Sequence, residues 1–224
     1  MTTKRISRRD FLKVSGIVLG STLLVGSGLS VLENQQPEIS LPEFQFGENQ
    51  MSKKILVTYA SQSGSTAGIA EAIGKSLSDG GAQVDVVPMN KVQDLSTYSA
   101  VIAGSAIQGQ KWLPEAMQFM RDHQSELSRK PFASFMSCIT LSMKNADQYR
   151  DGLKEWMSPV RAMVRPVSEG YFAGTLEFSK IPFSFNTLAM RIPVLMGIWK
   201  EGDHRDWNAI RNWAEGLRPL LLRV

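Results

Sequence analysis

The chain has 224 residues, of which 43% are hydrophobic and 21% are charged, and its formal net charge at pH 7 is +4. This length suffices for one domain with a substantial core, and the composition excludes a disordered acidic tail, a collagen-like repeat and a polytopic membrane protein. One cysteine, Cys138, and two histidines exclude an intrachain disulfide and a metal site rich in Cys or His. We therefore expect no metal, and any redox chemistry must come from a bound cofactor.

The positive charge belongs to the larger part of the chain. Residues 1–50 hold five basic and five acidic residues, whereas residues 51–224 hold 20 basic and 16 acidic residues. These charges are scattered, without a run of five of the same sign. Such a modest surplus predicts small anionic molecules or lipid surfaces as partners and argues against nucleic acid.

Residues 1–32 have the order of an export signal, in which basic residues precede an apolar stretch and then a polar one. The sequence SRRDFLK at 7–13 is followed by nineteen uncharged residues at 14–32. Arg8 and Arg9 before Phe-Leu-Lys resemble the twin-arginine motif, which implies the twin-arginine translocase as a partner and a protein folded with its cofactor before transport. We expect a location in the periplasm or on the outer face of the cytoplasmic membrane.

The fate of residues 14–32 is left open by the sequence. Gly28, Leu29 and Ser30 provide small residues without an Ala-x-Ala cleavage site, and nineteen apolar residues just suffice to span a bilayer, so either cleavage or a retained anchor fits. A buried helix is a third interpretation, although nothing amphipathic interrupts the segment. Residues 33–52 are polar and contain proline, which predicts a linker and places the folded domain at 53–224.

This domain is predicted to begin with a strand, a hydroxyl-rich loop and a helix. Residues 55–60 are a short apolar run, and apolar residues then recur at helical spacing as far as Gly80 and Gly81. Backbone N–H groups at a helix N-terminus, the helix dipole and nearby hydroxyls together bind anions. The candidate phosphate ligands in the connection are Ser61, Gln62, Ser63, Gly64, Ser65 and Thr66.

Two nucleotide signatures are missing from this connection. It has no lysine at its end, as a nucleoside-triphosphate loop needs, and no Gly-x-Gly-x-x-Gly for a dinucleotide. A monophosphate fits better, and Ser61, Ser63, Gly64 and Thr66 resemble the FMN-phosphate loop of flavodoxin-like proteins. An ordinary helix cap is the alternative, but it explains only Ser65 or Thr66. The resemblance implies FMN as the cofactor.

The alternation of strands and helices continues to the end of the chain. Further strands are predicted at 83–89, 100–107, 132–140 and 167–176, and helices at 114–123, 145–157 and 205–222. This pattern predicts an α/β fold with a doubly wound, five-stranded parallel sheet in the flavodoxin-like order 2-1-3-4-5. The ligand crevice then lies between the first and third strands, at their carboxyl ends.

Loops after the third and fourth strands are expected to surround the flavin ring. Their candidate residues are Gly104, Ser105, Ala106, Ile107, Gln108, Gly109, Trp112, Ser137, Ile139 and Thr140. Trp112 fits a core position equally well, and Cys138 fits a buried, inert thiol better than a redox group. No residue is identified as a catalytic acid or base.

The C-terminal part adds an insertion at 181–199, which contains Arg191 as its single charge, before the sequence GDHRDW at 202–207. This arrangement is similar to the menaquinone-dependent protoporphyrinogen IX dehydrogenase family. The similarity implies an FMN-dependent oxidoreductase that passes electrons from a lipophilic or anionic donor to a quinone or another acceptor. An exported flavodoxin-type electron carrier without its own substrate is the alternative, against which the basic net charge argues mildly.

The insertion is apolar on all sides of its predicted helix. Such a helix is either part of the core or lies against a membrane surface, a quinone or a porphyrin. Pro182, Pro193 and Arg191 argue against a helix that spans a membrane. Two features depart from the similar family, because this chain carries an export signal and its insertion is shorter and less basic.

Overall fold

A computed structural model describes residues 41–47, 54–143, 146–178, 191–192 and 194–221. The expected export signal and most of the insertion lie outside these residues. Among the described helices, none is long and apolar enough to cross a membrane. The chain divides into two compact units, Ile39–Glu177 with Glu201–Val224 and Met1–Glu38 with Phe178–Lys200, and the first of them contains the central sheet.

The central sheet confirms the predicted strand order. Its parallel strands run in the order β3-β2-β4-β6-β7, and in order of sequence this arrangement is 2-1-3-4-5. Their bounds are β2 (Lys54–Ala60), β3 (Gln83–Pro88), β4 (Ala100–Gln108), β6 (Phe132–Ser137) and β7 (Ser168–Phe172). The carboxyl ends of β2, β4 and β6 therefore meet at one edge.

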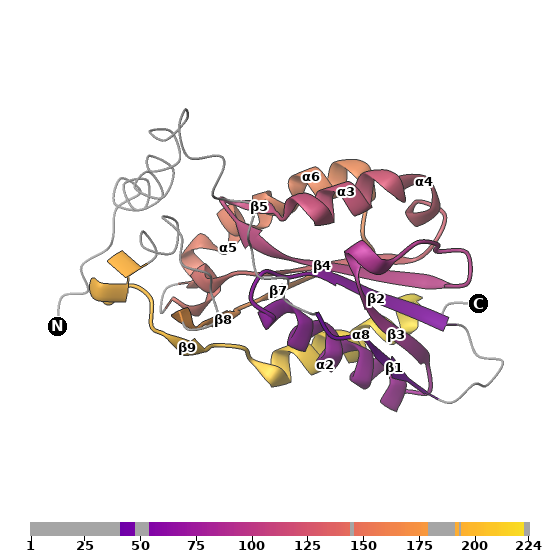
Figure 1. Ribbon diagram of the computed structural model, residues 1–224, viewed down its shortest axis with the longest axis horizontal. Coiled ribbons are helices and arrows are strands. Elements are labelled where there is room, and N and C mark those ends of the chain that lie inside the picture. Colours follow the sequence, from indigo (N-terminus) through magenta and orange to yellow (C-terminus); the bar gives the residue numbers. More distant parts are fainter. Residues whose placement is uncertain (1–40, 48–53, 144–145, 179–190, 193, 222–224) are drawn as a thin grey trace. The chain divides into compact units, whose positions relative to one another are not determined.

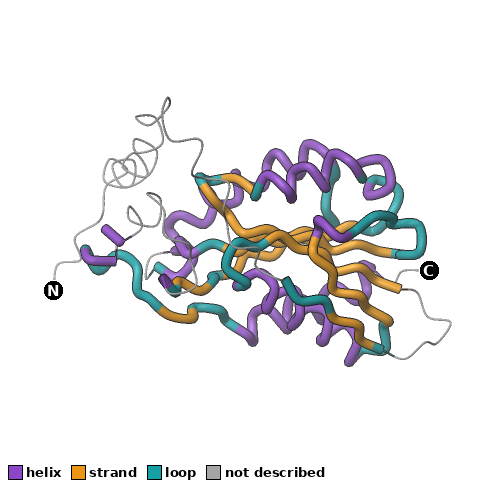
Figure 2. The backbone as a smooth tube through the Cα atoms, in the orientation of Figure 1, coloured by secondary structure: helices purple, strands orange, loops and turns teal. Residues whose placement is uncertain are grey.

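Helices cover both faces of the sheet (Figures 1 and 2), because the strands carry apolar residues on both sides. On one face, α2 (Ser65–Asp79) and α8 (Trp207–Leu221) pack against Ile55, Val57 and other apolar residues of the strands. On the other face, Leu56, Phe132 and Met136 pack against a second group of helices. These helices are α3 (Pro114–Asp122), α4 (Gln124–Leu127), α5 (Ala146–Lys154) and α6 (Ser158–Met163).

The expected linker contributes a strand of its own. In β1 (Phe44–Phe46), Phe44 pairs with Val86 and Phe46 with Val84, antiparallel to β3. Both rings pack against the core, and this burial stabilises a strand too short to be recognised within a polar, proline-containing segment. The predicted linker therefore contains a short strand that pairs with the sheet of the folded domain.

Two further strand predictions need correction. The fourth strand ends at Ser137, and a 3₁₀ turn, Ile139–Ser142, follows it. The predicted strand at 167–176 is divided, because β7 ends at Phe172 and β8 (Thr175–Leu176) pairs instead with β9 (Gly202–Asp203) in a separate two-stranded sheet. The segment 177–201 therefore connects two paired strands.

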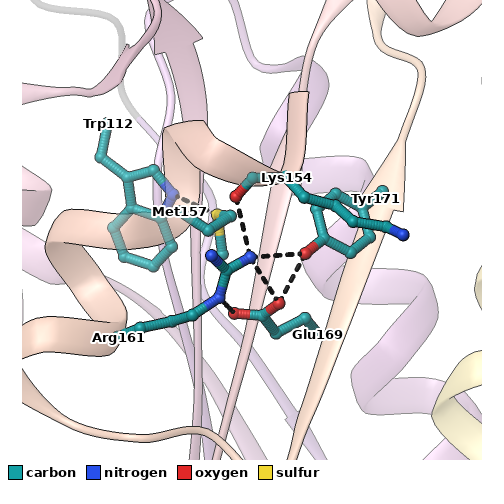
Figure 3. A network of polar contacts seen from close by, with 6 residues as sticks. All are labelled: Trp112, Lys154, Met157, Arg161, Glu169 and Tyr171. Carbon is teal, nitrogen blue, oxygen red and sulfur yellow. Dashed lines mark hydrogen bonds and ion pairs between the residues drawn. The ribbon is translucent and has the colours of Figure 1, made fainter. Parts of the chain in front are cut away.

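A network of hydrogen bonds and an ion pair connects α6 to the edge strand β7 (Figure 3). Arg161 donates from Nε to Glu169 Oε1 at 2.8 Å and from Nη2 to Glu169 Oε2 at 3.0 Å. The same Nη2 reaches the Tyr171 hydroxyl at 3.1 Å and the backbone oxygen of Lys154 at 2.8 Å. Burial, and after it the hydrogen bond to Glu169, raises the pKa of Tyr171 to about 12.

Removing the cation from this network should destabilise the fold. We expect Arg161→Ala to lower the free energy of unfolding by about 1–2 kcal/mol, because the largely buried Glu169 would lose its cation and keep only the hydrogen bond from the Tyr171 hydroxyl. Urea unfolding measures the change. Arg121→Ala, an exposed arginine on α3, is the control and should cost less than about 0.5 kcal/mol. Adding Glu169→Gln to Arg161→Ala should restore part of the loss; purely additive losses would contradict the interpretation.

Candidate functional site

The loop that follows β2 turns the chain sharply into α2. Ser61 lies directly after the buried strand, and Gly64 caps the helix with φ 80° and ψ −10°. A Cβ atom at Gly64 would meet nothing within 4 Å, so this position needs glycine for its left-handed backbone and not for space. The turn places the first N–H groups of α2 at the carboxyl end of β2.

The N-terminus of α2 is open to an anion. Within the described part of the chain, no side chain caps this helix, and its first turn contains no acidic residue. The first backbone N–H groups of a helix have no partner inside the helix, and its dipole adds positive charge there. An anionic group placed at this end would receive both contributions.

A buried hydroxyl in the same loop also lacks a partner. Ser61 is 7% exposed, and its Oγ atom makes no hydrogen bond with the described residues. A buried polar atom left in this way costs about 1–3 kcal/mol, so such an atom usually has a partner outside the protein chain. The residues therefore fit a phosphate with its hydrogen-bond acceptors.

Other predicted phosphate ligands connect the loop to its neighbours. Thr66 Oγ1 lies 2.8 Å from Ser137 Oγ, which joins the first turn of α2 to the end of β6. Ser65 Oγ accepts a hydrogen bond from Thr175 N at 2.9 Å and keeps its own proton available. Gln62 is exposed and donates to Gln108 Oε1 at 3.1 Å, whereas Ser63 is half-buried. The structure thus brings the loop together with the ends of β4 and β6.

The predicted ring contacts after β4 form a hairpin. The strand continues to Gln108, and β5 (Lys111–Trp112) returns alongside it through Gly109 and Gln110, which have φ values of 56° and 66°. Ala106 and Ile107 are half-buried, and Gln108 and Gly109 are exposed. This group is accessible to a ligand at the edge next to the loop.

Three of the residues predicted to contact the flavin ring instead make contacts within the protein. A Cβ atom at Gly104 would lie 2.0 Å from the Phe135 ring, so this glycine makes room for the core. The Ser105 hydroxyl accepts from Leu113 N at 3.0 Å and donates to the Ala106 oxygen at 2.8 Å. Trp112 is 3% exposed and donates its indole N–H to Met157 Sδ, so its ring is occupied by core contacts.

Residues at and just after the end of β6 lie on the other side of the candidate site. Ser137 is buried beside Thr66, and Ile139 and Thr140 are half-buried in the 3₁₀ turn. Cys138 is buried, and this burial raises the pKa of its thiol. The predicted burial of Cys138 is confirmed, and the lack of redox reactivity stays a prediction. Among the described residues, no group of three or more His, Cys, Asp or Glu could hold a metal.

Two residues at the loop were missed by the sequence reasoning. Thr175 reaches Ser65 through its backbone N–H, and Arg205 Nη1 lies 3.4 Å from the Ser65 backbone oxygen. Thr175 had been placed inside the predicted strand at 167–176, and Arg205 follows β9, a strand that the sequence did not predict. The sequence GDHRDW at 202–207, noted as part of the resemblance, was the signal that contained Arg205.

Comparison with known proteins adds the family context. The family model "Flavodoxin domain" matches residues 56–203. Protoporphyrinogen IX dehydrogenase (quinone) from Leishmania major is 27% identical over 182 residues, which cover 77% of this chain and 78% of that protein.

Solved structures similar to the chain include two flavodoxins. A flavodoxin from Streptococcus pneumonia TIGR4 is 20% identical, with a TM-score of 0.48, and the match covers 73% of this chain and 97% of that one. Flavodoxin 2 from Bacillus cereus is 24% identical, with a TM-score of 0.44 and coverage of 72% and 94%.

Proposed function

The chain belongs to the flavodoxin domain family, whose cofactor is FMN, and from this premise we propose that it is an oxidoreductase passing electrons from a reduced donor to a quinone or another acceptor. The observation that carries the proposal is the uncapped N-terminus of α2 beside the unpartnered Ser61 hydroxyl. Both belong to a loop that fits the FMN phosphate. They lie at the carboxyl edge of the sheet, where doubly wound folds bind their ligands.

The chain's own residues would bind and orient the cofactor. Ser61, Ser63 and Thr66, with the backbone N–H groups that open α2, would hold the phosphate. Residues 106–109 on one side and Ser137, Ile139 and Thr140 on the other would hold the ring. When bound, FMN supplies the redox chemistry, since its ring can take up electrons and give them back.

The identity of the donor and acceptor is proposed from the similar curated protein. That protein is a protoporphyrinogen IX dehydrogenase that uses a quinone, so we propose a lipophilic, protoporphyrinogen-like donor and a quinone acceptor. Part of the insertion supports lipophilic contact: Ile192, Leu195 and Met196 are 46%, 87% and 67% exposed. Arg191 and Lys200 are exposed nearby in sequence, and such cations suit an anionic donor or an anionic membrane surface.

Removing hydroxyls from the loop should weaken binding of the phosphate. We expect Ser63→Ala with Thr66→Ala to reduce FMN affinity about 100-fold or more, because each lost hydrogen bond to a charged group costs about 1.5–3 kcal/mol. Quenching of flavin fluorescence by the apoprotein measures the affinity, and Ser128→Ala on an exposed helix end is the control. Unchanged FMN affinity, or an equal loss for riboflavin, would contradict the phosphate assignment.

Turnover distinguishes the enzyme from an electron carrier. The wild-type holoprotein should convert anaerobic protoporphyrinogen IX to fluorescent protoporphyrin when menadione is present. Leu195→Ser with Met196→Ser should slow this reaction about tenfold while the bound-flavin spectrum persists, because two exposed apolar contacts are lost. Val167→Ser, another exposed apolar position at 48%, is the matched control. If the wild-type protein does not oxidise this donor and exchanges electrons only with protein partners, the result would favour the alternative function, an electron carrier without its own substrate.

We also propose export by the twin-arginine translocase. Its receptor reads both arginines, so Arg8→Lys with Arg9→Lys should leave the flavoprotein in the cytoplasm. Cell fractionation followed by flavin fluorescence and immunoblotting measures the distribution, and Lys4→Arg with Arg5→Lys is a control outside the paired motif. Wild-type amounts of the double variant outside the cytoplasm would contradict export by the twin-arginine translocase.

A further inference from the structure

Two distant segments of the chain converge on Ser65, the first residue of α2. Thr175 of β8 donates its backbone N–H to Ser65 Oγ at 2.9 Å, and Arg205, just after β9, donates from Nη1 to the Ser65 oxygen at 3.4 Å. Because Thr175 pairs with Asp203 in the β8–β9 sheet, these segments are also bound to each other. The first turn of α2 is thus held from outside by residues at both ends of the 177–201 connection.

Neighbouring residues fix the orientation of the Arg205 side chain. Asp203 accepts from Arg205 Nε at 2.9 Å and from Nη2 at 2.7 Å, and its Oδ1 atom also accepts from the Arg205 backbone N–H at 3.0 Å. The guanidinium lies over the Trp207 ring, 4.3 Å from its centroid. The hydrogen bond from Arg205 also holds the pKa of Asp203 below its ordinary value. A bidentate pair with a stacked ring leaves little freedom to the guanidinium.

A glycine within α2 accommodates this guanidinium. A Cβ atom at Gly68 would lie 2.5 Å from Arg205 Nη1 and 3.7 Å from the Trp207 ring. Glycine is unfavourable inside a helix, so its use here indicates that the space is needed. Gly68 N also donates to the Gly64 oxygen at 3.3 Å, the bond that closes the first turn of α2. Arg205 therefore lies against the turn that presents its N–H groups to the anion.

We propose that Asp203, Arg205 and Trp207 form a clamp that positions the first turn of α2 for binding the FMN phosphate. The proposal rests on the phosphate site proposed above, and it makes Arg205 a positioning residue that does not itself contact the cofactor. Hydrogen bonds from backbone N–H groups depend steeply on angle, so a loosened turn would bind the phosphate more weakly. Riboflavin has no phosphate, and its affinity should change little.

The test compares the affinities of the apoprotein for FMN and riboflavin. We expect Arg205→Gln to reduce FMN affinity about tenfold and riboflavin affinity much less. Arg205→Lys, which keeps the charge but loses the bidentate pair, should behave like Arg205→Gln. Gly68→Ala should have the same effect by displacing the guanidinium, whereas Gly216→Ala on α8, with nothing within 4 Å of its added Cβ, should have none.

A double variant separates the clamp from a general loss of stability. Gly68→Ala combined with Arg205→Gln should reduce FMN affinity no more than either change alone, since both act on one contact. A merely structural role would lower FMN and riboflavin affinity by the same factor, because unfolding competes equally with both ligands. An equal loss of affinity for both flavins would overturn the clamp. So would wild-type FMN affinity in Arg205→Lys, or a loss of FMN affinity in the double variant that equals the sum of the two single losses. Equal affinities of the wild-type apoprotein for both flavins would instead overturn the phosphate site itself.

Discussion

An open helix N-terminus at the end of a buried strand is the feature on which the candidate site depends. The first N–H groups of α2 have no partners within the helix, and no described side chain caps them, so the chain must hold this end in place by other means. Gly64 provides the left-handed turn, Thr66 is joined to Ser137 of β6, and Ser65 is held by β8 and Arg205. These contacts leave the first N–H groups of α2 and the Ser61 hydroxyl without a partner among the described residues. Thr66 Oγ1 can still donate a hydrogen bond to a phosphate when it accepts one from Ser137 Oγ.

The sequence predicted the parallel sheet and its order because buried parallel strands are short apolar runs separated by helical patterns. It missed β1, since a strand of three residues has little local signal and depends on packing of Phe44 and Phe46. It also predicted one strand across 167–176, although the chain leaves the sheet after Phe172. The pairing of β8 with β9 joins positions more than twenty residues apart, which no local pattern reveals.

The candidate site was predictable where its chemistry lies in one short motif. The hydroxyls and glycine at 61–66 predicted an anion site, and the structure places them in one turn at the N-terminus of α2. Binding of an anion there stays a prediction. Residues whose roles depend on distant partners were ambiguous: Gly104 makes room for Phe135, and Trp112 lies against Met157 in the core. Arg205 could be assigned only after folding placed it against Ser65, 140 residues earlier in the chain. Long-range packing therefore decides which loop residues remain for a ligand.

The relative affinity of the wild-type apoprotein for FMN and riboflavin tests the account most directly. The two flavins share the ring and differ in the phosphate, so their ratio isolates the contribution of the α2 N-terminus and its hydroxyls. With two or more charged hydrogen bonds to the phosphate, we expect FMN to bind about 100-fold more tightly or better in a fluorescence titration. Equal affinity for FMN and riboflavin would contradict the assignment of this loop as a phosphate site.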